Sequence, residues 1–350
     1  MKLISLIGKD PLNILLPLTQ LTNLIDGAYF LTTEAYYSMA ERIKAWLLQW
    51  DRDVESPGWD QSIDIVVFEK QTGYQEIYSR IREIMDQEYR RNEEVAFINQ
   101  GGNKTMQHAA SFASREMLAP LLTVDTRLFR MQLSFLSWDR KAAARYDLPC
   151  VPMQLSLQTL LQLYGLNFTQ NIPKNTTSGF RYEQKIYEAF ADAKNNGKFT
   201  DVERNLIFTW NEASERKNEI DIVVMRKGVI GFISIKGGRS IRNADCFVRE
   251  YKKIIQQYPD TLAGKPCLKM LICKEKIQSG RFIRMLANEI VAIDNVWADS
   301  QLQLAVELAA AGCDHIAKTG RPLPFDFYHR FISKQYGKWG NIIGGMRKGG

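Results

Sequence analysis

The chain has 350 residues, of which 45% are hydrophobic and 11% aromatic, so it has the length and composition for two ordinary folded domains rather than for a disordered protein. Its net charge of +7 is uneven, because residues 1–150 carry 17 Lys and Arg against 20 Asp and Glu, whereas residues 151–350 carry 29 against 19. A basic second half suits a polyanionic partner, and the acidic first half argues against a nucleic-acid surface there.

Cysteine usage and hydropathy argue against further classes of protein. The five cysteines show no C-x-x-C spacing, which disfavours a disulfide framework and a cysteine zinc site. No run approaches the roughly 18 continuous apolar residues of a membrane span. The apolar run at the start is broken by Lys9 and Asp10 and indicates a first strand rather than a secretory signal. We therefore expect a reduced, cytoplasmic protein without a membrane segment.

The first half of the chain alternates strand-like and helix-like stretches. Apolar runs cover residues 2–8, 27–33, 62–69 and 93–100, and a stretch with helical spacing follows each of them. This βα order predicts an α/β domain with a mainly parallel, doubly wound sheet, whose ligands bind at the carboxyl ends of the strands. One more strand is expected within residues 127–139, and a helix within residues 154–165 closes the unit.

The second half has a different rhythm. A polar stretch at 166–179 with Pro173 and Gly179 predicts the main domain boundary. Beyond it, a helix, a β-meander, a further strand and another helix are expected at 180–195, 206–210, 219–226, 228–236, 267–274 and 279–290. The predicted division is a first domain at 1–150, a connecting helix and linker at 151–178, a second α/β domain at 179–300, and a helical extension with a basic, Gly-rich tail at 301–350.

One candidate ligand site follows from the segment INQGGNKTMQ, residues 98–107. A strand ends there, two glycines turn the chain, and a helix opens, so backbone N–H groups and a lysine point towards an anion. A Gly-Gly turn also serves as a plain connection, but polar loops after the first two strands belong to the same edge of the sheet. The candidate ligand-binding residues are Gly8, Lys9, Asp10, Asn13, Thr32, Thr33, Asn99, Gly101, Gly102, Asn103, Lys104 and Thr105.

The segment NQGGNKTM resembles the N-x-T-G-G-T-K-x-M signature of CARF domains, the CRISPR-associated Rossmann-like sensors of cyclic oligoadenylates. Gln100 and Asn103 depart from that signature. The resemblance covers about residues 1–150. It implies a homodimer with one ligand pocket shared across the two-fold axis, and cyclic tetra-adenylate is the expected activator.

A second constellation is spread over the C-terminal half. Side chains alternate along a strand, so Glu219 and Asp221 share one face, and Ser234 and Lys236 share one face of the next strand. If the two strands form a hairpin, these pairs meet, and Glu183 approaches from a helix. Carboxylates grouped in this way hold Mg²⁺ or Mn²⁺, and a lysine beside them stabilises an oxyanion.

This constellation resembles the PD-(D/E)xK, restriction-endonuclease-like nucleases, in particular those fused to CARF domains in type III CRISPR systems. The resemblance covers about residues 175–300. It implies that Glu183 is the helix acid, Asp221 the main metal ligand and Lys236 the catalytic lysine. Ser234 stands where the family has an acid. Glu219 is the expected replacement, since it lies two residues from Asp221 on the same strand face.

Three functions are compatible with these motifs. The leading one is a metal-dependent endonuclease that cuts DNA or RNA when cyclic oligoadenylate binds, in antiviral defence. The alternative is a non-catalytic effector whose degenerate domain, with Ser234 in place of the acid, only binds nucleic acid or a partner. A ring nuclease that degrades its own activator is the third, and it leaves the C-terminal motif unexplained.

Overall fold

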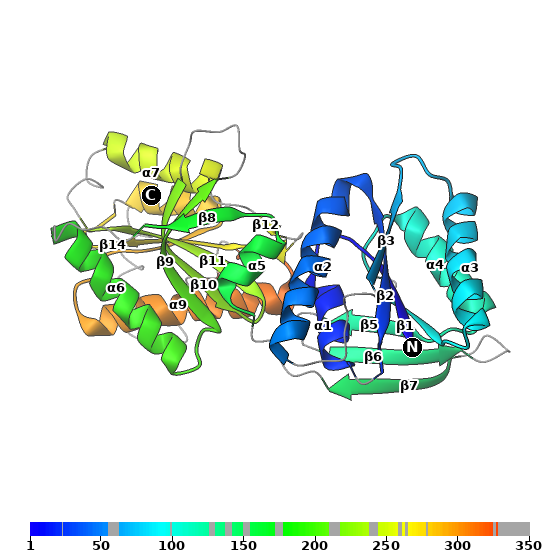
Figure 1. The fold of residues 1–350 in the computed structure, drawn as a ribbon. Coiled ribbons are helices and arrows are strands. Elements are labelled where there is room, and N and C mark those ends of the chain that lie inside the picture. The colour runs from blue at the N-terminus through cyan, green and yellow to red at the C-terminus, as the bar shows by residue number, and fades with distance from the viewer. Residues whose placement is uncertain are drawn as a thin grey trace. The chain divides into compact units, whose positions relative to one another are not determined.

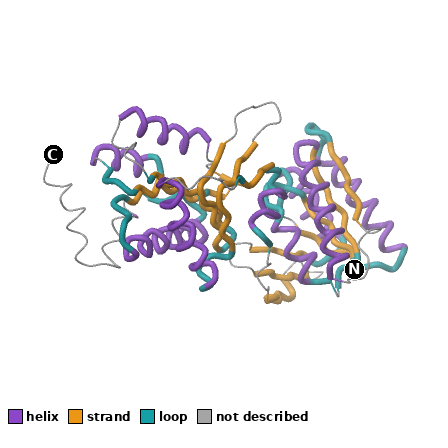
Figure 2. The backbone as a smooth tube through the Cα atoms, turned by 60° about the vertical axis from the view of Figure 1, so that its left-hand side comes forward, coloured by secondary structure: helices purple, strands orange, loops and turns teal. Residues whose placement is uncertain are grey.

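The computed structural model describes residues 1–22, 24–54, 63–98, 100–125, 130–136, 142–149, 155–171, 178–209, 218–237, 244–257, 261–262, 265–277, 279–324 and 327. The chain divides into an N-terminal unit, residues 1–155 with 159–165, and a C-terminal unit, residues 156–158 with 166–350. In each unit a sheet lies between helices, as two views show (Figures 1 and 2). Among these residues no helix is both long enough and apolar enough to cross a membrane.

The described strands of the N-terminal unit form a seven-stranded sheet in the order β3-β2-β1-β4-β5-β6-β7. They are β1 Lys2–Leu6, β2 Gly27–Thr33, β3 Ile63–Phe68, β4 Val95–Ile98, β5 Leu121–Asp125, β6 Arg130–Leu136 and β7 Ala142–Pro149. β1 to β5 are parallel, and β6 and β7 continue the sheet antiparallel. The parallel, doubly wound sheet is thus confirmed, whereas β5 and β7 were not expected from the sequence.

Helices cover both faces of this sheet. Their bounds are α1 Leu12–Gln20, α2 Glu34–Val54, α3 Tyr74–Arg90 and α4 Lys104–Glu116. α1 and α2 lie on one face and α3 and α4 on the other (Figure 1). The apolar positions of α3 recur every three or four residues, at Ile77, Ile81 and Ile84, and pack in one buried cluster with β1 and α4. Amphipathic spacing is therefore what fixes the helix faces against the sheet.

The C-terminal unit is built on a six-stranded sheet of described strands, in the order β15-β14-β11-β10-β9-β8. These are β8 Asn167–Gln170, β9 Asp201–Thr209, β10 Asn218–Arg226, β11 Val229–Lys236, β14 Leu268–Cys273 and β15 Ile290–Ile293. β9 to β11 form the expected antiparallel meander, and β8, which was not expected, adds an antiparallel edge strand to β9. β11, β14 and β15 are parallel. A small hairpin joins β12 Thr261–Leu262 to β13 Lys265–Pro266.

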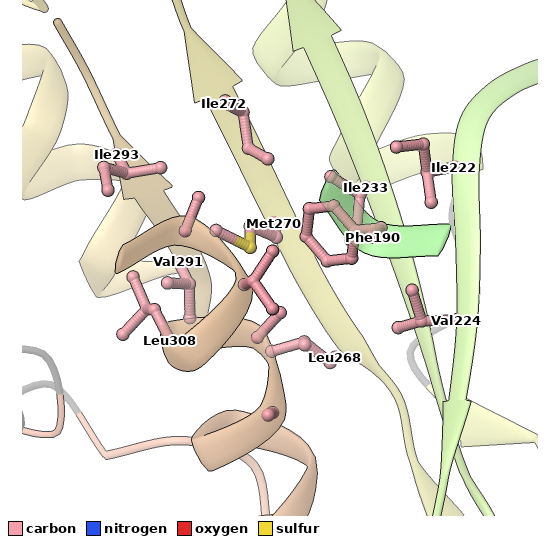
Figure 3. Close-up of a cluster of buried hydrophobic side chains, with 14 of the residues drawn as sticks. Phe190, Ile222, Val224, Ile233, Leu268, Met270, Ile272, Val291, Ile293 and Leu308 are labelled. Atoms are coloured by element: carbon pink, nitrogen blue, oxygen red, sulfur yellow. The ribbon is translucent and has the colours of Figure 1, made fainter. Parts of the chain in front are cut away.

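The core of this unit lies between the sheet and two helices, α6 Ser178–Asn195 and α9 Asp299–Thr319. Phe190 of α6 and Leu308 of α9 point into a layer of strand side chains that includes Ile222, Ile233 and Met270 (Figure 3). Each of these five side chains is fully buried. α9 falls in the stretch expected to be a C-terminal extension, yet its Ala- and Leu-rich face forms part of the central core.

Other elements differ from the sequence expectations or lie beyond the described part. β8 begins inside the polar stretch that was expected to be a linker, and the rest of that linker, residues 172–177, lies outside the described residues. α5 Leu157–Leu163 and α8 Ser279–Ala287 match expected helices. α7 Ala244–Gln257 was not predicted, although it brings a functional side chain to the site below. The basic tail from residue 328 onwards is outside the described residues.

Candidate functional site

The candidate ligand site of the N-terminal unit lies where the sheet changes direction. The chain runs from β1 outward through β2 to β3 and then returns to β4 on the other side of β1, so β1 and β4 are parallel neighbours. Their carboxyl ends open side by side, and the N–H of Gly102 donates to the carbonyl of Ile7 over 3.1 Å. Doubly wound folds bind ligands at this switch point.

Three glycines, Gly8, Gly101 and Gly102, bring the two loops together; we call them the glycine cradle. A Cβ on Gly8 would lie 2.7 Å from the Cα of Gly101, and one on Gly101 would lie 2.1 Å from the carbonyl oxygen of Leu6. Gly101 and Gly102 also have φ values of +106° and +62°, in the region that favours glycine. Any side chain at Gly8 or Gly101 would force the loops apart.

Helix α4 begins directly after the cradle, so its N-terminus lies next to the two loops. Asn103 caps α4, since its Oδ1 accepts from the N–H of Met106 at 2.9 Å. Gln107 fixes the cradle by donating from Nε2 to the carbonyl of Gly101 at 2.9 Å, and Gln100 accepts from the N–H of Val124 at 2.6 Å. Lys104 is exposed at the first turn. A helix N-terminus with an adjacent cation favours an anionic ligand.

The other predicted ligand residues are distributed around this opening. Lys9 is exposed, while Asp10, Asn13, Thr33 and Thr105 are half-buried. The side chain of Asp10 accepts from the N–H of Leu12 at 3.1 Å. Thr32 is fully buried and donates to the carbonyl of Thr33, so it supports the loop from below. Asn99 lies outside the described residues.

A second site forms on the hairpin of β10 and β11. Ile222 pairs with Ile233, which sets Asp221 opposite Ser234 on one face of the sheet. The Oγ of Ser234 lies 3.2 Å from Asp221 Oδ2, and the N–H of Ile235 donates to the same oxygen at 2.5 Å. The Nζ of Lys236 lies 3.9 Å from it. The structure therefore brings Asp221 together with Ser234 and Lys236, as the sequence predicts.

A further acid, Glu250, reaches this group from α7. Its Oε1 accepts from the Oγ of Ser234 at 2.6 Å, and its Oε2 lies 3.4 Å from Lys236 Nζ. The side chain is only 11% exposed. We call Asp221, Ser234, Lys236 and Glu250 the acid–lysine cluster. The sequence did carry a signal for Glu250, because it precedes the buried Ile254 by four residues and so occupies the inward face of an amphipathic helix.

The charges in the cluster depend on one another. Burial by itself would lower the pKa of Lys236, but the carboxylates of Asp221, Glu250 and Glu183 outweigh it and raise that pKa, so the amine stays charged. Ser234 is fully buried and carries a single hydroxyl proton, so it donates to one carboxylate at a time. The two acids are thus held together by one ammonium group and one shared hydroxyl.

Glu183 of α6 lies in a pocket next to the cluster. Burial is the main cause that raises its pKa to about 7, the charge of Asp221 adds to the shift, and Lys236 opposes it. Glu219 raises the pKa of Glu183 as well, which places it within electrostatic reach of the same pocket. The pocket is lined by Phe180, Glu183, Gln184, Tyr187, Arg204, Asn205 and Asp221.

Arg204 is a second cation at this pocket that the sequence did not single out. Its guanidinium lies 4.7 Å from the centre of the Tyr187 ring and donates to Gln184. The pocket therefore combines two carboxylates, which attract a cation, with one guanidinium group, which attracts an anion such as a phosphate.

The donor chemistry fits a hard divalent cation. Asp221, Glu250 and Glu183 offer carboxylate oxygens, which Mg²⁺ and Mn²⁺ prefer. Burial is the main cause of the raised pKa of Glu183, and the charges of Asp221 and Glu219 add to it; a bound cation would offset those charges. Within the described part of the chain, no group of three or more His, Cys, Asp or Glu side chains is already close enough to hold a metal ion. The carboxylates would have to draw together around one.

Comparison with known proteins yields a likeness of fold. No known family matches the sequence, and neither does any curated protein. Protein VC1899 from Vibrio cholerae has a TM-score of 0.66 at 14% identity, covering 90% of this chain and 98% of that chain. Can2 from Sulfobacillus thermosulfidooxidans, in complex with cyclic tetra-adenylate, has a TM-score of 0.61 at 14% identity, covering 88% and 98%. The fold is shared.

A third similar structure is a type III CRISPR defence DNA nuclease activated by cyclic oligoadenylate, with a TM-score of 0.53 at 13% identity. The match covers 88% of this chain and 51% of that chain. At these identities the likeness concerns the fold. It confirms the expected class, an N-terminal Rossmann-like α/β domain followed by a second α/β domain.

Proposed function

We propose that this chain is a nuclease of type III CRISPR defence, activated by a cyclic oligoadenylate and dependent on Mg²⁺ or Mn²⁺. The observation that carries the proposal is the contact of Lys236 with Asp221 on adjacent strands, beside the pocket that holds Glu183. A half-buried lysine next to carboxylates is an arrangement suited to metal-assisted cleavage of a phosphodiester. The shared fold with Can2 bound to cyclic tetra-adenylate and with a cyclic-oligoadenylate-activated DNA nuclease supports it.

In the N-terminal unit, the glycine cradle and the start of α4 bind the activator. Cyclic tetra-adenylate carries a phosphate at each nucleotide, and the N-terminus of α4 with Lys9 and Lys104 supplies donors and positive charge. Asn103 and Thr105 add polar contacts at the same opening, with Asp10, Asn13 and Thr33 on the facing loops. Asn99, outside the described residues, is a ligand candidate from the sequence alone. The ring is symmetric, so two copies of the chain share one ring as a homodimer.

In the C-terminal unit, Asp221 is the central metal ligand, and Glu183 and Glu219 stand beside it. A bound divalent cation lowers the pKa of its water and neutralises the charge of the scissile phosphate. Lys236 is held charged next to that position and stabilises the negative charge that develops on the phosphate oxygens. Arg204, in the same pocket, binds a flanking phosphate of DNA or RNA.

The test is cleavage of supercoiled plasmid and of single-stranded RNA by the full chain at neutral pH. Each substrate is incubated with and without cyclic tetra-adenylate, and with Mn²⁺, Mg²⁺ or EDTA. We expect cutting only when activator and metal are both present. A protein that binds the activator and nucleic acid but cuts neither substrate is the non-catalytic effector instead, the alternative that Ser234 favours.

A further inference from the structure

We propose that Glu250 supplies the acid that β11 lacks at Ser234, so that the cation site is completed from helix α7 instead of from the strand. The inference rests on the proposed metal-dependent function and names a residue that completes it. On this view, a serine at position 234 does not mean that the site is inactive, because the acid comes from α7 instead of from β11.

Glu250 contacts both the residue that stands at position 234 and the lysine two residues further along the strand. Its two oxygens lie 2.6 Å from Ser234 Oγ and 3.4 Å from Lys236 Nζ. Asp221 contacts the same two groups, at 3.2 Å and 3.9 Å. The two carboxylates therefore converge on one hydroxyl and one ammonium group, although they come from different elements.

Ser234 has the size that this arrangement needs. It is fully buried, between Asp221 on the adjacent strand and Glu250 on the helix. A carboxylate at position 234 would meet that of Glu250 at close range, and two like charges at such a distance repel strongly. A serine leaves room for the helix acid and holds it with a hydrogen bond, so Ser234 is a positioning residue.

The balance of charge argues against a purely structural ion pair. Two largely buried carboxylates contact one ammonium group, and the charge of Asp221 also acts on Glu183, where Lys236 and Lys253 oppose it. A structural pair would need one acid for the one lysine, because a second carboxylate beside the first costs desolvation energy and repels it. The surplus negative charge matches what a divalent cation requires.

Glu219, the replacement expected from the sequence, is the competing candidate. It shares a strand face with Asp221 and acts through its charge on Glu183. Glu250, in contrast, contacts both Ser234 and Lys236 directly. The two acids make opposite predictions for the same experiment, so one set of variants separates them.

The experiment measures Mn²⁺ binding to the full chain by calorimetry, without activator or nucleic acid, together with the melting temperature with and without Mn²⁺. The variants are Glu250→Gln, Glu219→Gln, Ser234→Glu and the double variant Ser234→Glu with Glu250→Gln. Glu188→Gln, an exposed acid on α6, is the matched control. Cleavage in the presence of cyclic tetra-adenylate is recorded in parallel.

We expect Glu250→Gln to weaken Mn²⁺ binding by at least about tenfold and to remove most of the Mn²⁺-induced rise in melting temperature. The double variant restores both, because it returns the acid to the strand, whereas Ser234→Glu alone does not improve on the wild type. Glu188→Gln binds Mn²⁺ like the wild type.

Two results overturn the inference. If Glu250→Gln lowers the melting temperature but binds Mn²⁺ as tightly as the wild type, Glu250 is only an ion-pair partner of Lys236. If Glu219→Gln alone removes binding, Glu219 completes the site. If the wild type binds no Mn²⁺, both the proposed metal dependence and this inference are wrong. If the wild type binds Mn²⁺ and Glu250→Gln binds it equally well, only the role of Glu250 is wrong.

Discussion

The glycine cradle and the acid–lysine cluster are assembled in opposite ways. The cradle is made of backbone, and its three glycines lie in two short segments after adjacent strands. The cluster is made of side chains from β10, β11 and α7, which span residues 221 to 250. A backbone site is fixed by the few positions where only glycine fits, whereas a side-chain site can receive the same chemical group from more than one element.

This difference explains why one site was easier to predict than the other. The Gly-Gly turn, the following cap and the lysine form a continuous signature, and the parallel order of the sheet brings Gly8 to it. The meeting of Asp221 with Ser234 and Lys236 was also predictable, since strand alternation and a hairpin fix it. Glu250 was missed because α7 itself was not predicted: the spacing to Ile254 marks the inward face of the helix, but where that face meets the sheet depends on tertiary packing.

The division of the chain was harder to predict for the same reason. The polar stretch at 166–179 has the composition of a linker, yet Asn167–Gln170 pairs with β9 as an edge strand. Backbone pairing can recruit a polar segment wherever a neighbouring strand offers an unpaired edge. α9 looked like an appendage because it follows the motifs, but its small, apolar residues allow close packing against β14, where Gly312 faces Leu268.

The largest expected effect comes from removing the cation of the cluster. Lys236→Met should lower the rate of cleavage by about 100- to 1,000-fold, because it removes the group that stabilises charge on the phosphate. Binding of cyclic tetra-adenylate, measured by calorimetry, should be unchanged, since the two sites belong to different units. If Lys236→Met also weakened binding of the activator, the glycine cradle and the acid–lysine cluster would not be independent sites.

The next effect concerns the cradle. Gly101→Ala should lower the free energy of unfolding by more than about 2 kcal/mol, because the new Cβ meets a backbone carbonyl in addition to the strain of a positive φ. Gly197→Ala is the control, since Gly197 has a φ of +71° but nothing within 4 Å. It isolates the conformational cost of about 1 kcal/mol. Equal losses in urea unfolding for the two variants would contradict a close-packed cradle.

A smaller effect is expected for the exposed lysine at the cradle. Lys104→Ala should weaken binding of cyclic tetra-adenylate by about 1.5–3 kcal/mol, the value of a charge-assisted hydrogen bond to a phosphate. Lys104→Arg should keep most of the affinity. Arg90→Ala is the matched control, because Arg90 lies in the last turn of α3, at the opposite end of the parallel strands. Equal affinities for all three variants and the wild type would remove Lys104 from the site.

The smallest effect is a difference in stability between two acids of the C-terminal unit, Asp314 in an ion pair and Glu183 beside the acid–lysine cluster. Although burial alone would raise the pKa of Asp314, hydrogen bonds from Arg226 and Lys227 lower it, in contrast to Glu183. Asp314→Asn should therefore cost about 1 kcal/mol at pH 7, a value limited by solvent screening. Because the folded pKa is depressed, this contribution is present above pH of about 4, the unfolded pKa, and disappears as the pH falls through the folded pKa.

Thermal unfolding of the wild type and of Asp314→Asn at pH 7 and pH 3 measures the stability that the charge of Asp314 contributes at each pH. Glu183→Gln should behave in the opposite way and leave stability at pH 7 unchanged or higher, because its charge is opposed by burial and by Asp221. A loss of stability in Glu183→Gln as large as that in Asp314→Asn would mean that Glu183 is a structural acid.

The most direct test of the account is the dependence of nucleic-acid cleavage on the activator. The wild-type chain is incubated with plasmid or single-stranded RNA in Mn²⁺, and the initial rate is measured as cyclic tetra-adenylate is titrated, with Lys236→Met as the inactive reference. We predict a rate that rises from the level of the reference to saturation as the cradle fills. A wild-type rate that equals that of Lys236→Met at every activator concentration would contradict the account.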